Sequence, residues 1–373
     1  MNNRAFGIIF SNMHDETVQE LTLKRTMASI PFGGRYRLID FALSNMYNSD
    51  ITKVGVITKS NYQSLMDHLG SGKEWDLSRK REGLFILPPF GSAHAGFYKS
   101  RLEALIGIGD FIEHSAGDSI VLTDCDNICN LNYNIPLEYH LKNHADVTVI
   151  CKRATGEELG GGSLVAYNRG EDGRVSDILI APRDAQQEYS YGLNMWIVRR
   201  GFLESVLEEA RAHSLESWER DILQKGCAKA RVFAWEHEGY VGRINSLQRY
   251  FRINMDLLGA AVRDELFFRH GHIYTKVRDE APARYGAGAK VANSLVADGC
   301  VIEGEVENSV LFRGVSVGRG AKVSNSIVMQ SARIDSNVKL NYTIIDKDVM
   351  VKDNRILMGF DSYPLYIAKG SVV

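Results

Sequence analysis

The stretch NSLVADGCVIEGEVENSVLFRGVSVGRGAKVSNSIVMQSARIDSNVKLNYTIIDKDVMVKDN, residues 293–354, decides the fold of the C-terminal part of the chain. Its Asn-Ser-aliphatic-aliphatic motif recurs at Asn293, Asn308 and Asn325, with a variant at Asn341, so the spacings are 15, 17 and 16 residues. Within each unit, aliphatic residues lie six positions apart. This spacing is typical of a parallel β-helix of hexapeptide repeats, in which each coil buries its aliphatic side chains against the next. A β-sandwich would instead need alternation with a period of two, which the stretch lacks.

The first 260 residues show a different pattern, in which strand-like and helix-like segments alternate. Short β-branched runs that are typical of buried parallel strands lie at 6–10, 53–58, 119–124 and 147–151. Helical patterns lie between them, at 37–49, 101–115 and 136–145. This order predicts a Rossmann-like sheet with helices on both faces. Because ligands of such sheets bind beyond the C-terminal ends of the strands, we expect the loop 11–16 and the turn 124–126 to share one crevice.

Composition limits the classes of partner. The net charge of -2 shows no basic excess, so we expect no nucleic acid, and no apolar run reaches the 18 residues typical of a membrane span. The N-terminal apolar run is too short for a signal peptide. The five cysteines are odd in number and form no Cys-x-x-Cys pair, which favours free thiols in the reducing cytoplasm.

We expect three segments: an α/β domain over 1–260, a linker over 261–289 and a left-handed β-helix over 290–373.

The loop after the first strand has an unusual composition for its place. A loop that holds phosphate needs glycines or exposed backbone amides, and usually a cation. Residues 12–16 instead read Asn-Met-His-Asp-Glu. The segments on either side of the loop are typical of a nucleotide site, but the loop itself contains large side chains and two carboxylates.

Three motifs place the chain near a known family. PFGGRYRLIDFALSN (31–45), HLGSGKEWDLSRKREGLFILPP (68–89) and VGRINSLQRYFRINMDLL (241–258), followed by a hexapeptide β-helix, resemble bacterial glucose-1-phosphate adenylyltransferase (ADP-glucose pyrophosphorylase). The match spans nearly the whole chain, which more narrowly looks like the D-type subunits of Gram-positive bacteria. The resemblance implies a nucleotidyltransferase fold, ATP and glucose 1-phosphate as the family's substrates, Mg²⁺ as its metal, and tetramers.

The phosphate loop departs from the family pattern, which is G-G-x-G-x-R-L followed by R-A-K-P. Aligned on Leu21-Thr22, the chain has other residues at each of these positions: Asn12, Met13 and Asp15 for three glycines, Thr17 for the arginine, and Met27 for the lysine. These changes remove both cations and the close approach of the backbone. We expect the carboxylates of Asp15 and Glu16 to repel a triphosphate.

The positions that hold the metal and the sugar phosphate also differ. Asp126 matches one metal-binding aspartate of the family, but Asn245 stands for the other, in VGRIN for V-G-T-I-D, so we expect weak or absent Mg²⁺ binding. Ala181 stands for the lysine that grips the sugar phosphate, and Asn194 stands for a glycine. Glu103 stands for an aspartate, after Ser-Arg-Leu in place of Gly-Thr-Ala.

Arg35 and Arg37 are retained beside a glycine turn at a predicted helix start. Two guanidiniums there can hold a phosphorylated effector, and by resemblance this region faces the family's regulatory site. A salt-bridged surface or a subunit contact explains the pair equally well.

Three functions remain open. The first is a regulatory, catalytically weak or inactive subunit that pairs with a catalytic subunit in a heterotetramer, or forms a homo-oligomer, in glycogen biosynthesis. The second is an active adenylyltransferase with a rearranged site, in which Asp126 and Glu103 hold the metal and Lys24, Arg25 or Lys99 supplies the missing charge. The third is a non-enzymatic scaffold. A hexapeptide-repeat acyltransferase is disfavoured, because residues 290–360 contain no histidine.

Overall fold

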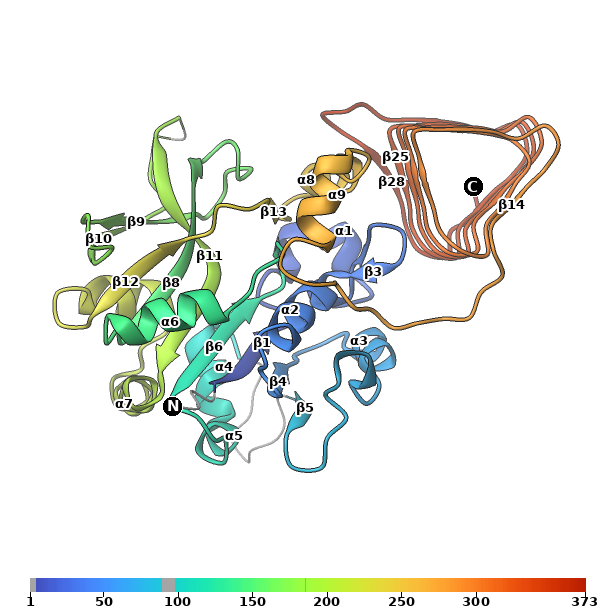
Figure 1. Ribbon diagram of the computed structural model, residues 1–373. Helices are drawn as coiled ribbons and strands as arrows, with labels where there is room; N and C mark the ends of the chain where they lie inside the picture. Colours follow the sequence, from blue (N-terminus) through green and yellow to red (C-terminus); the bar gives the residue numbers. More distant parts are fainter. Residues whose placement is uncertain (1–4, 89–97, 185) are drawn as a thin grey trace.

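The computed structural model describes residues 5–88, 98–184 and 186–373. Figure 1 shows an α/β part with helices on both sides of a twisted sheet, next to a three-sided β-helix viewed along its axis. No helix of the described residues is long and apolar enough to cross a membrane.

One half of the central sheet is parallel and carries the crevice. Its strands are β1 (Ala5–Phe10), β4 (Lys53–Ile57), β5 (Gly83–Leu87) and β6 (Ser119–Asp124), in the order β6-β1-β4-β5. Phe10 is paired with Asp124, so β1 and β6 end at the same edge. The predicted strands at 6–10, 53–58 and 119–124 are confirmed, and β6 is buried at every position because both of its faces are covered.

The other half of the sheet makes it mixed rather than purely parallel. Its long strand β11 (Glu188–Arg199) runs antiparallel to both β6 and β8 (Val147–Thr155). The predicted strand at 147–151 therefore exists, but its parallel partner is only β12 (Val232–Glu236). The remaining strands of this half are β9 (Val165–Arg169) and β10 (Val175–Ile180).

Helices enclose two apolar cores, one on each face of the sheet. The predicted helix at 101–115 is interrupted at Ile108 and forms two short helices. The helices are α1 (Gln19–Thr22), α2 (Leu38–Tyr47), α3 (Gln63–Leu69), α4 (Arg101–Gly107), α5 (Gly109–Glu113), α6 (Asn134–Lys142), α7 (Arg200–His213), α8 (Leu247–Asp256) and α9 (Ala260–Phe267). Two short pairs of strands, β2 (Pro31–Phe32) with β3 (Tyr36–Arg37) and β7 (Asn127–Ile128) with β13 (Gly242–Arg243), shape the loops above the sheet.

The β-helix consists of three parallel sheets of five strands each. The first contains β14 (Arg284–Tyr285), β17 (Val301–Ile302), β20 (Ser316–Val317), β23 (Arg333–Ile334) and β26 (Met350–Val351). The second contains β15 (Lys290–Ala292), β18 (Glu305–Glu307), β21 (Lys322–Ser324), β24 (Lys339–Asn341) and β27 (Ile356–Met358). The third contains β16 (Leu295–Val296), β19 (Val310–Leu311), β22 (Ile327–Val328), β25 (Thr343–Ile345) and β28 (Leu365–Ile367). Both α9 and β14 include residues of the segment 261–289, which the sequence pattern predicts to be a linker.

The Asn-Ser motif of the repeats has a structural cause. Asn293, Asn308 and Asn325 all have positive φ angles, of 41, 46 and 44°, at one corner of the β-helix. Asparagine tolerates this left-handed conformation better than most residues do. The Asn293 side chain also donates a hydrogen bond to the side chain of Asn308 at 2.7 Å, and Asn325 donates to Asn341 at 3.0 Å. The repeat therefore conserves the geometry of a corner that stacks from coil to coil.

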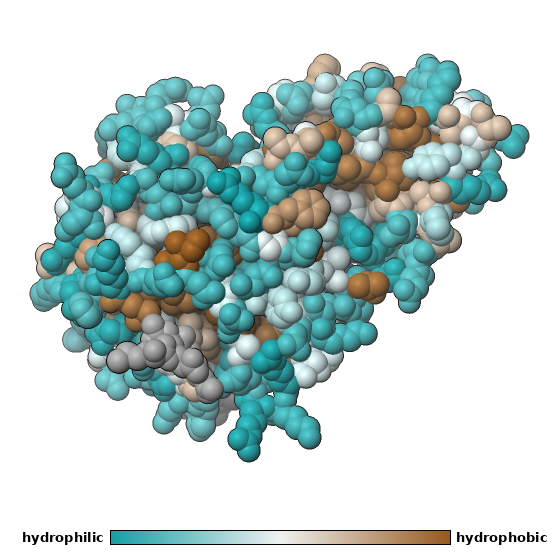
Figure 2. Space-filling model, in the orientation of Figure 1, coloured by the Kyte–Doolittle hydropathy of each residue, from teal (hydrophilic) through white to brown (hydrophobic). Residues whose placement is uncertain are grey.

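The surface is polar over most of the face in Figure 2, with hydrophobic residues gathered over the β-helix beside the α/β part. The last coil exposes large apolar side chains at Ile356, Met358, Phe360 and Tyr363.

Candidate functional site

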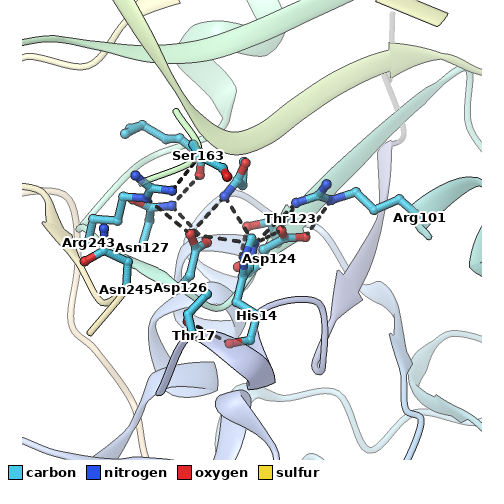
Figure 3. A network of polar contacts seen from close by, with 12 residues as sticks. His14, Thr17, Arg101, Thr123, Asp124, Asp126, Asn127, Ser163, Arg243 and Asn245 are labelled. Atoms are coloured by element: carbon cyan, nitrogen blue, oxygen red, sulfur yellow. Dashed lines mark hydrogen bonds and ion pairs between the residues drawn. The ribbon is translucent and has the colours of Figure 1, made fainter. Parts of the chain in front are cut away.

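The loop after β1 and the turn after β6 meet in one crevice, as the sequence predicted. His14 of the loop lies with Nε2 2.7 Å from Oδ2 of Asp124 and 3.7 Å from Oδ2 of Asp126 (Figure 3). Both aspartates are about 2% exposed, so their charges have little contact with solvent. Burial alone would lower the pKa of His14, but the carboxylates of Asp126 and Asp124 outweigh it and the pKa of His14 is raised.

An arginine whose side chain is 13% exposed neutralises the first aspartate. Arg101, the first residue of α4, donates hydrogen bonds from Nε and Nη2 to the two oxygens of Asp124, and from Nη1 to Glu219 at 2.7 Å. Its guanidinium also lies 5.1 Å from the ring centre of Trp196. Burial would raise the pKa of Asp124, but Arg101 and His14 reverse this and hold the pKa of Asp124 below its usual value. Asp124 is therefore a fixed, paired anion.

The second aspartate is enclosed by amides and by another arginine. Asp126 accepts a hydrogen bond from Asn127 Nδ2 at 2.9 Å on Oδ1, and from Asn194 Nδ2 at 2.9 Å on Oδ2. Nε of Arg243 lies 3.7 Å from the same Oδ2. The structure thus joins two residues that the sequence predicted for different sites, Asp126 for the metal and Asn194 for the sugar phosphate.

The Arg243 and Asn245 side chains tie a glycine-rich segment over this turn. Arg243 donates from Nη1 to the carbonyl of Gly161 and from Nη2 to that of Ser163, both at 3.0 Å. Asn245 donates from Nδ2 to the carbonyls of Gly160 at 3.1 Å and Gly161 at 3.0 Å. The residue at the predicted second metal position therefore holds backbone. Its buried Oδ1 has no hydrogen-bond partner among the described residues.

The phosphate loop is closed by its own side chains. Asn12 donates from Nδ2 to Oδ2 of Asp15 at 2.6 Å and accepts the backbone N–H of Lys59 at 3.0 Å. Oδ1 of Asp15 accepts the backbone N–H of Met27 at 2.7 Å. Amides that could face a phosphate are thus bound by side chains of the protein.

The carboxylate of Asp15 accepts hydrogen bonds from Asn12 and Met27, so it occupies donors of the loop, in addition to the repulsion of a triphosphate that its charge predicts. Burial raises the pKa of Asp15 to about 6. Thr17 donates its hydroxyl to the His14 carbonyl at 2.8 Å, and the Met27 side chain is buried in the core where the family has a lysine.

The raised pKa of Asp15 makes a prediction about pH. Between its usual value and about 6, the native state keeps a proton that the unfolded chain has released, so the free energy of unfolding falls as pH rises through this window. We expect the Asp15→Asn variant to lose this slope, which amounts to on the order of 2 kcal/mol. Urea unfolding at several pH values between about 4 and about 6.5 measures it. Glu16→Gln, at the exposed neighbouring position, is the matched control, and equal slopes in wild type and Asp15→Asn would contradict the assignment.

Two other predicted residues lie outside this network, with no hydrogen bond to its members among the described residues. Glu103 is exposed on α4 and accepts the backbone N–H of Lys99 at 2.5 Å. Ala181 is exposed after β10, with φ +51°, and its N–H donates to the Leu164 carbonyl. Met13 packs partly buried against one of the two apolar cores.

A cavity of about 400 Å³ opens beside the closed loop. Its charged lining residues are Asp15, Glu16, Lys59 and Lys99, so positive and negative groups are balanced. Of the cations proposed for a rearranged active site, Lys99 reaches this cavity. Arg25 is buried elsewhere, in an ion pair with the β-helix.

The crevice fits a metal ion in spacing but not in chemistry. The ligand atoms of His14, Asp124 and Asp126 lie within 4.8 Å of one another. Mg²⁺ prefers an octahedron of oxygen ligands, most of them water or carboxylate. Here both oxygens of each aspartate already accept hydrogen bonds, and guanidiniums stand beside them. A divalent ion ~4 Å from one guanidinium would be repelled by on the order of 8 kcal/mol at an effective dielectric near 20. The residues present therefore do not fit a Mg²⁺ centre.

A second, cationic pocket lies between the α/β part and the β-helix. It brings together the predicted Arg35 and Arg37 with four cations that no sequence motif had indicated, Lys276, Arg278, Arg313 and Lys347. The other lining residues are Pro31, Gly34, Tyr36, His68, Phe312 and Gln330. None of these described lining residues is acidic. They come from segments as far apart as β3 and the last coils of the β-helix.

Three side chains of this pocket are held in unfavourable surroundings for a cation. Arg313 is only 6% exposed, and its Nε and Nη2 have no hydrogen-bond partner among the described residues. Burial, with Arg37 and Arg25 nearby, lowers the pKa of Lys347 to about 7. Burial also lowers the pKa of Arg37 to about 10. An anion in the pocket would relieve these costs, because buried charges are stabilised by a partner.

Comparisons with known proteins agree with the fold. Residues 16–256 match the family described as Nucleotidyl transferase, and residues 279–363 match the family described as GlmU-like, C-terminal hexapeptide. The chain is 35% identical to glycogen biosynthesis protein GlgD of Bacillus subtilis, over 100% of this chain and 97% of that protein. It is 36% identical to GlgD of Geobacillus stearothermophilus, over 86% and 83% of the two chains. It is also 32% identical to the glucose-1-phosphate adenylyltransferase of the same organism, again over 86% and 83%.

Proposed function

The chain belongs to the nucleotidyl transferase family, among the glucose-1-phosphate adenylyltransferases and GlgD proteins, and on this basis we propose that it is a regulatory subunit. It has weak or no activity of its own in converting ATP and glucose 1-phosphate to ADP-glucose and diphosphate. It acts in the cytoplasm in glycogen biosynthesis, where it modulates a catalytic subunit within a heterotetramer.

The observation that carries this proposal is the closed phosphate loop. Nucleotidyl transfer depends on positioning the phosphates and on neutralising their charge, usually with backbone amides, cations and Mg²⁺. In this chain the Asp15 carboxylate takes the Met27 amide, and Met27 itself is a buried core residue. In the turn after β6, Asp124 is paired with Arg101 and Asp126 with Arg243. The groups that would receive a triphosphate are bonded to one another.

Three further observations support a role beside a catalytic partner. Geobacillus stearothermophilus has both a GlgD protein and a glucose-1-phosphate adenylyltransferase that resemble this chain, so both kinds of relative occur in one organism. The cationic pocket between the two parts of the chain has the chemistry to bind a phosphorylated effector. The exposed apolar residues of the last coil offer a surface for subunit contact.

The test is the rate of ADP-glucose formation by the purified chain alone and after mixing with a catalytic subunit. Typical enzymes turn over ~10 times per second, and we expect the chain alone to be at least ~1000-fold slower. In the mixture, we expect a complex that co-elutes in gel filtration and a change in the kinetic constants of the catalytic subunit. The catalytic subunit alone is the control. Rapid turnover by the isolated chain, or a mixture whose components elute separately with unchanged kinetics, would contradict the proposal.

A further inference from the structure

We propose that Arg243 is a built-in substitute for a divalent cation, so that the crevice of this chain is closed and electrically balanced without any metal. The inference concerns the crevice alone. A subunit could modulate its partner with or without a metal of its own, so metal binding and kinetic modulation can fail independently.

The guanidinium of Arg243 lies beside a buried carboxylate. Arg243 is 6% exposed, and its Nε lies 3.7 Å from a carboxylate oxygen of Asp126, which is 2% exposed. The other oxygen of Asp126 accepts from Asn127, and the oxygen near Arg243 also accepts from Asn194. A metal ion would need those lone pairs and would meet a positive charge beside them. The side chain thus lies where it can compensate the buried aspartate itself.

The same guanidinium also binds the backbone of a glycine-rich segment. It donates to the carbonyls of Gly161 and Ser163, and Asn245 donates to those of Gly160 and Gly161. Gly160, Gly161 and Gly162 have φ angles of +79, +64 and +81°, a path that other residues rarely adopt. One arginine therefore bridges the acidic turn and the glycine segment.

The motif that contains Arg243 also changes the charge of the site. The family pattern V-G-T-I-D reads VGRIN in this chain, so threonine has become Arg243 and aspartate has become Asn245. The first change adds one positive charge and the second removes one negative charge. Together they alter the local charge by the amount that a divalent cation would supply. The two substitutions act on the same strand end, β13, and both side chains bind the same glycine segment.

The experiment is a titration of the full chain with Mn²⁺, followed by the electron paramagnetic resonance signal of free Mn²⁺. We expect the wild-type chain to leave millimolar Mn²⁺ free. The Arg243→Thr/Asn245→Asp variant restores the V-G-T-I-D motif, and we expect it to bind Mn²⁺ at least ~10-fold more tightly than wild type. Bound Mn²⁺ should also raise the melting temperature of this variant and leave that of wild type unchanged.

Two single variants separate the arginine from the missing carboxylate. Asn245→Asp keeps the guanidinium and Arg243→Lys keeps a cation, so we expect both to remain as weak as wild type. If the double variant fails to fold, as judged by circular dichroism, Arg243→Gln/Asn245→Asp keeps an amide donor for the glycine segment and takes its place. Tight Mn²⁺ binding by wild type, equal binding by Asn245→Asp alone and by the double variant, or no gain in a folded double variant would each overturn the proposal.

Discussion

The Asp346→Ala variant is expected to lower the free energy of unfolding by about 3 to 5 kcal/mol, because it leaves the buried charge of Arg25 without its carboxylate partner. Arg25 and Asp346 form an ion pair in which the single nitrogen Nη2 of Arg25 lies 2.8 and 2.9 Å from the two carboxylate oxygens. Their side chains are only 4% and 2% exposed. Asp346 also accepts the Tyr366 hydroxyl at 2.7 Å and the backbone N–H of Lys347 at 2.6 Å. Removal of its carboxylate leaves the guanidinium without its only carboxylate partner among the described residues.

The same ion pair joins the two parts of the chain. In the sequence, Arg25 stands between the phosphate loop and Met27, the residue whose backbone amide binds Asp15. Asp346 directly follows strand β25 of the β-helix.

Urea unfolding of wild type and of the Asp346→Ala variant measures the change in the free energy of unfolding. The double variant Arg25→Met/Asp346→Leu removes both charges and should cost far less than the single variant. The pair Arg153 and Glu188 is exposed, so Glu188→Ala should change stability by less than about 1 kcal/mol. A loss below about 1 kcal/mol in Asp346→Ala would contradict the argument.

This placement of Arg25 also bears on the alternative of a rearranged active site. The sequence left Arg25 open as a cation that could replace the lost lysine, because it is adjacent to the phosphate loop in the chain. In the fold it points to the β-helix, 321 positions away along the sequence. The sequence around Arg25 could not predict this orientation, because nothing near residue 25 identifies Asp346 as its partner.

The β-helix was predictable because its rule is local. Each Asn-Ser motif sets a corner with a positive φ angle, as at Asn325, and each corner stacks on the next at a fixed spacing. The parallel half of the α/β sheet was predictable for a similar reason, from short β-branched runs that alternate with helices. The antiparallel strand β11 was not, because a long partly exposed strand with the burial pattern of Glu188–Arg199 has no distinct signal for its pairing partner.

The candidate site was predictable by position and not by orientation. Alignment placed Asn12, Asp15 and Asp126 in the crevice, but it could not show that Asp15 turns inward to bind an amide. His14 and Arg243 were within the quoted motifs, yet their importance depends on contacts with residues far away in the chain. The useful signal was present in VGRIN: a new arginine next to a lost carboxylate suggests a compensated charge.

The cationic pocket, too, could be predicted only in part from the sequence. Arg35 and Arg37 could be singled out beside a glycine turn, but Arg313 and Lys347 belong to coils of the β-helix and look like ordinary surface cations in the sequence. Only the docking of the β-helix on the α/β part brings the four together. Because this pocket contains charges from both parts, an anion bound there would hold them in one arrangement.

Sulfate is expected to bind this pocket, and Arg313→Gln is expected to weaken that binding at least ~10-fold. The guanidinium of Arg313 is buried with two unpartnered nitrogens, so an anion gains hydrogen bonds that no described side chain supplies. Lys347 adds a pH dependence. Burial lowers its pKa to about 7, and a bound anion favours its protonated form, so the affinity for sulfate should rise as pH falls from about 8 to about 6.

Isothermal titration calorimetry with sulfate measures both effects, because the charge of sulfate, unlike that of phosphate, stays constant over this range. The Lys347→Met variant should lose the pH dependence but keep part of the affinity, since the arginines remain. Arg319, which is 84% exposed on the β-helix, provides the matched control, and Arg319→Gln should bind sulfate as wild type does. Unchanged affinity in Arg313→Gln, or an equal loss in Arg319→Gln, would show that sulfate is held by general surface charge. That result would contradict the assignment of this pocket as an effector site.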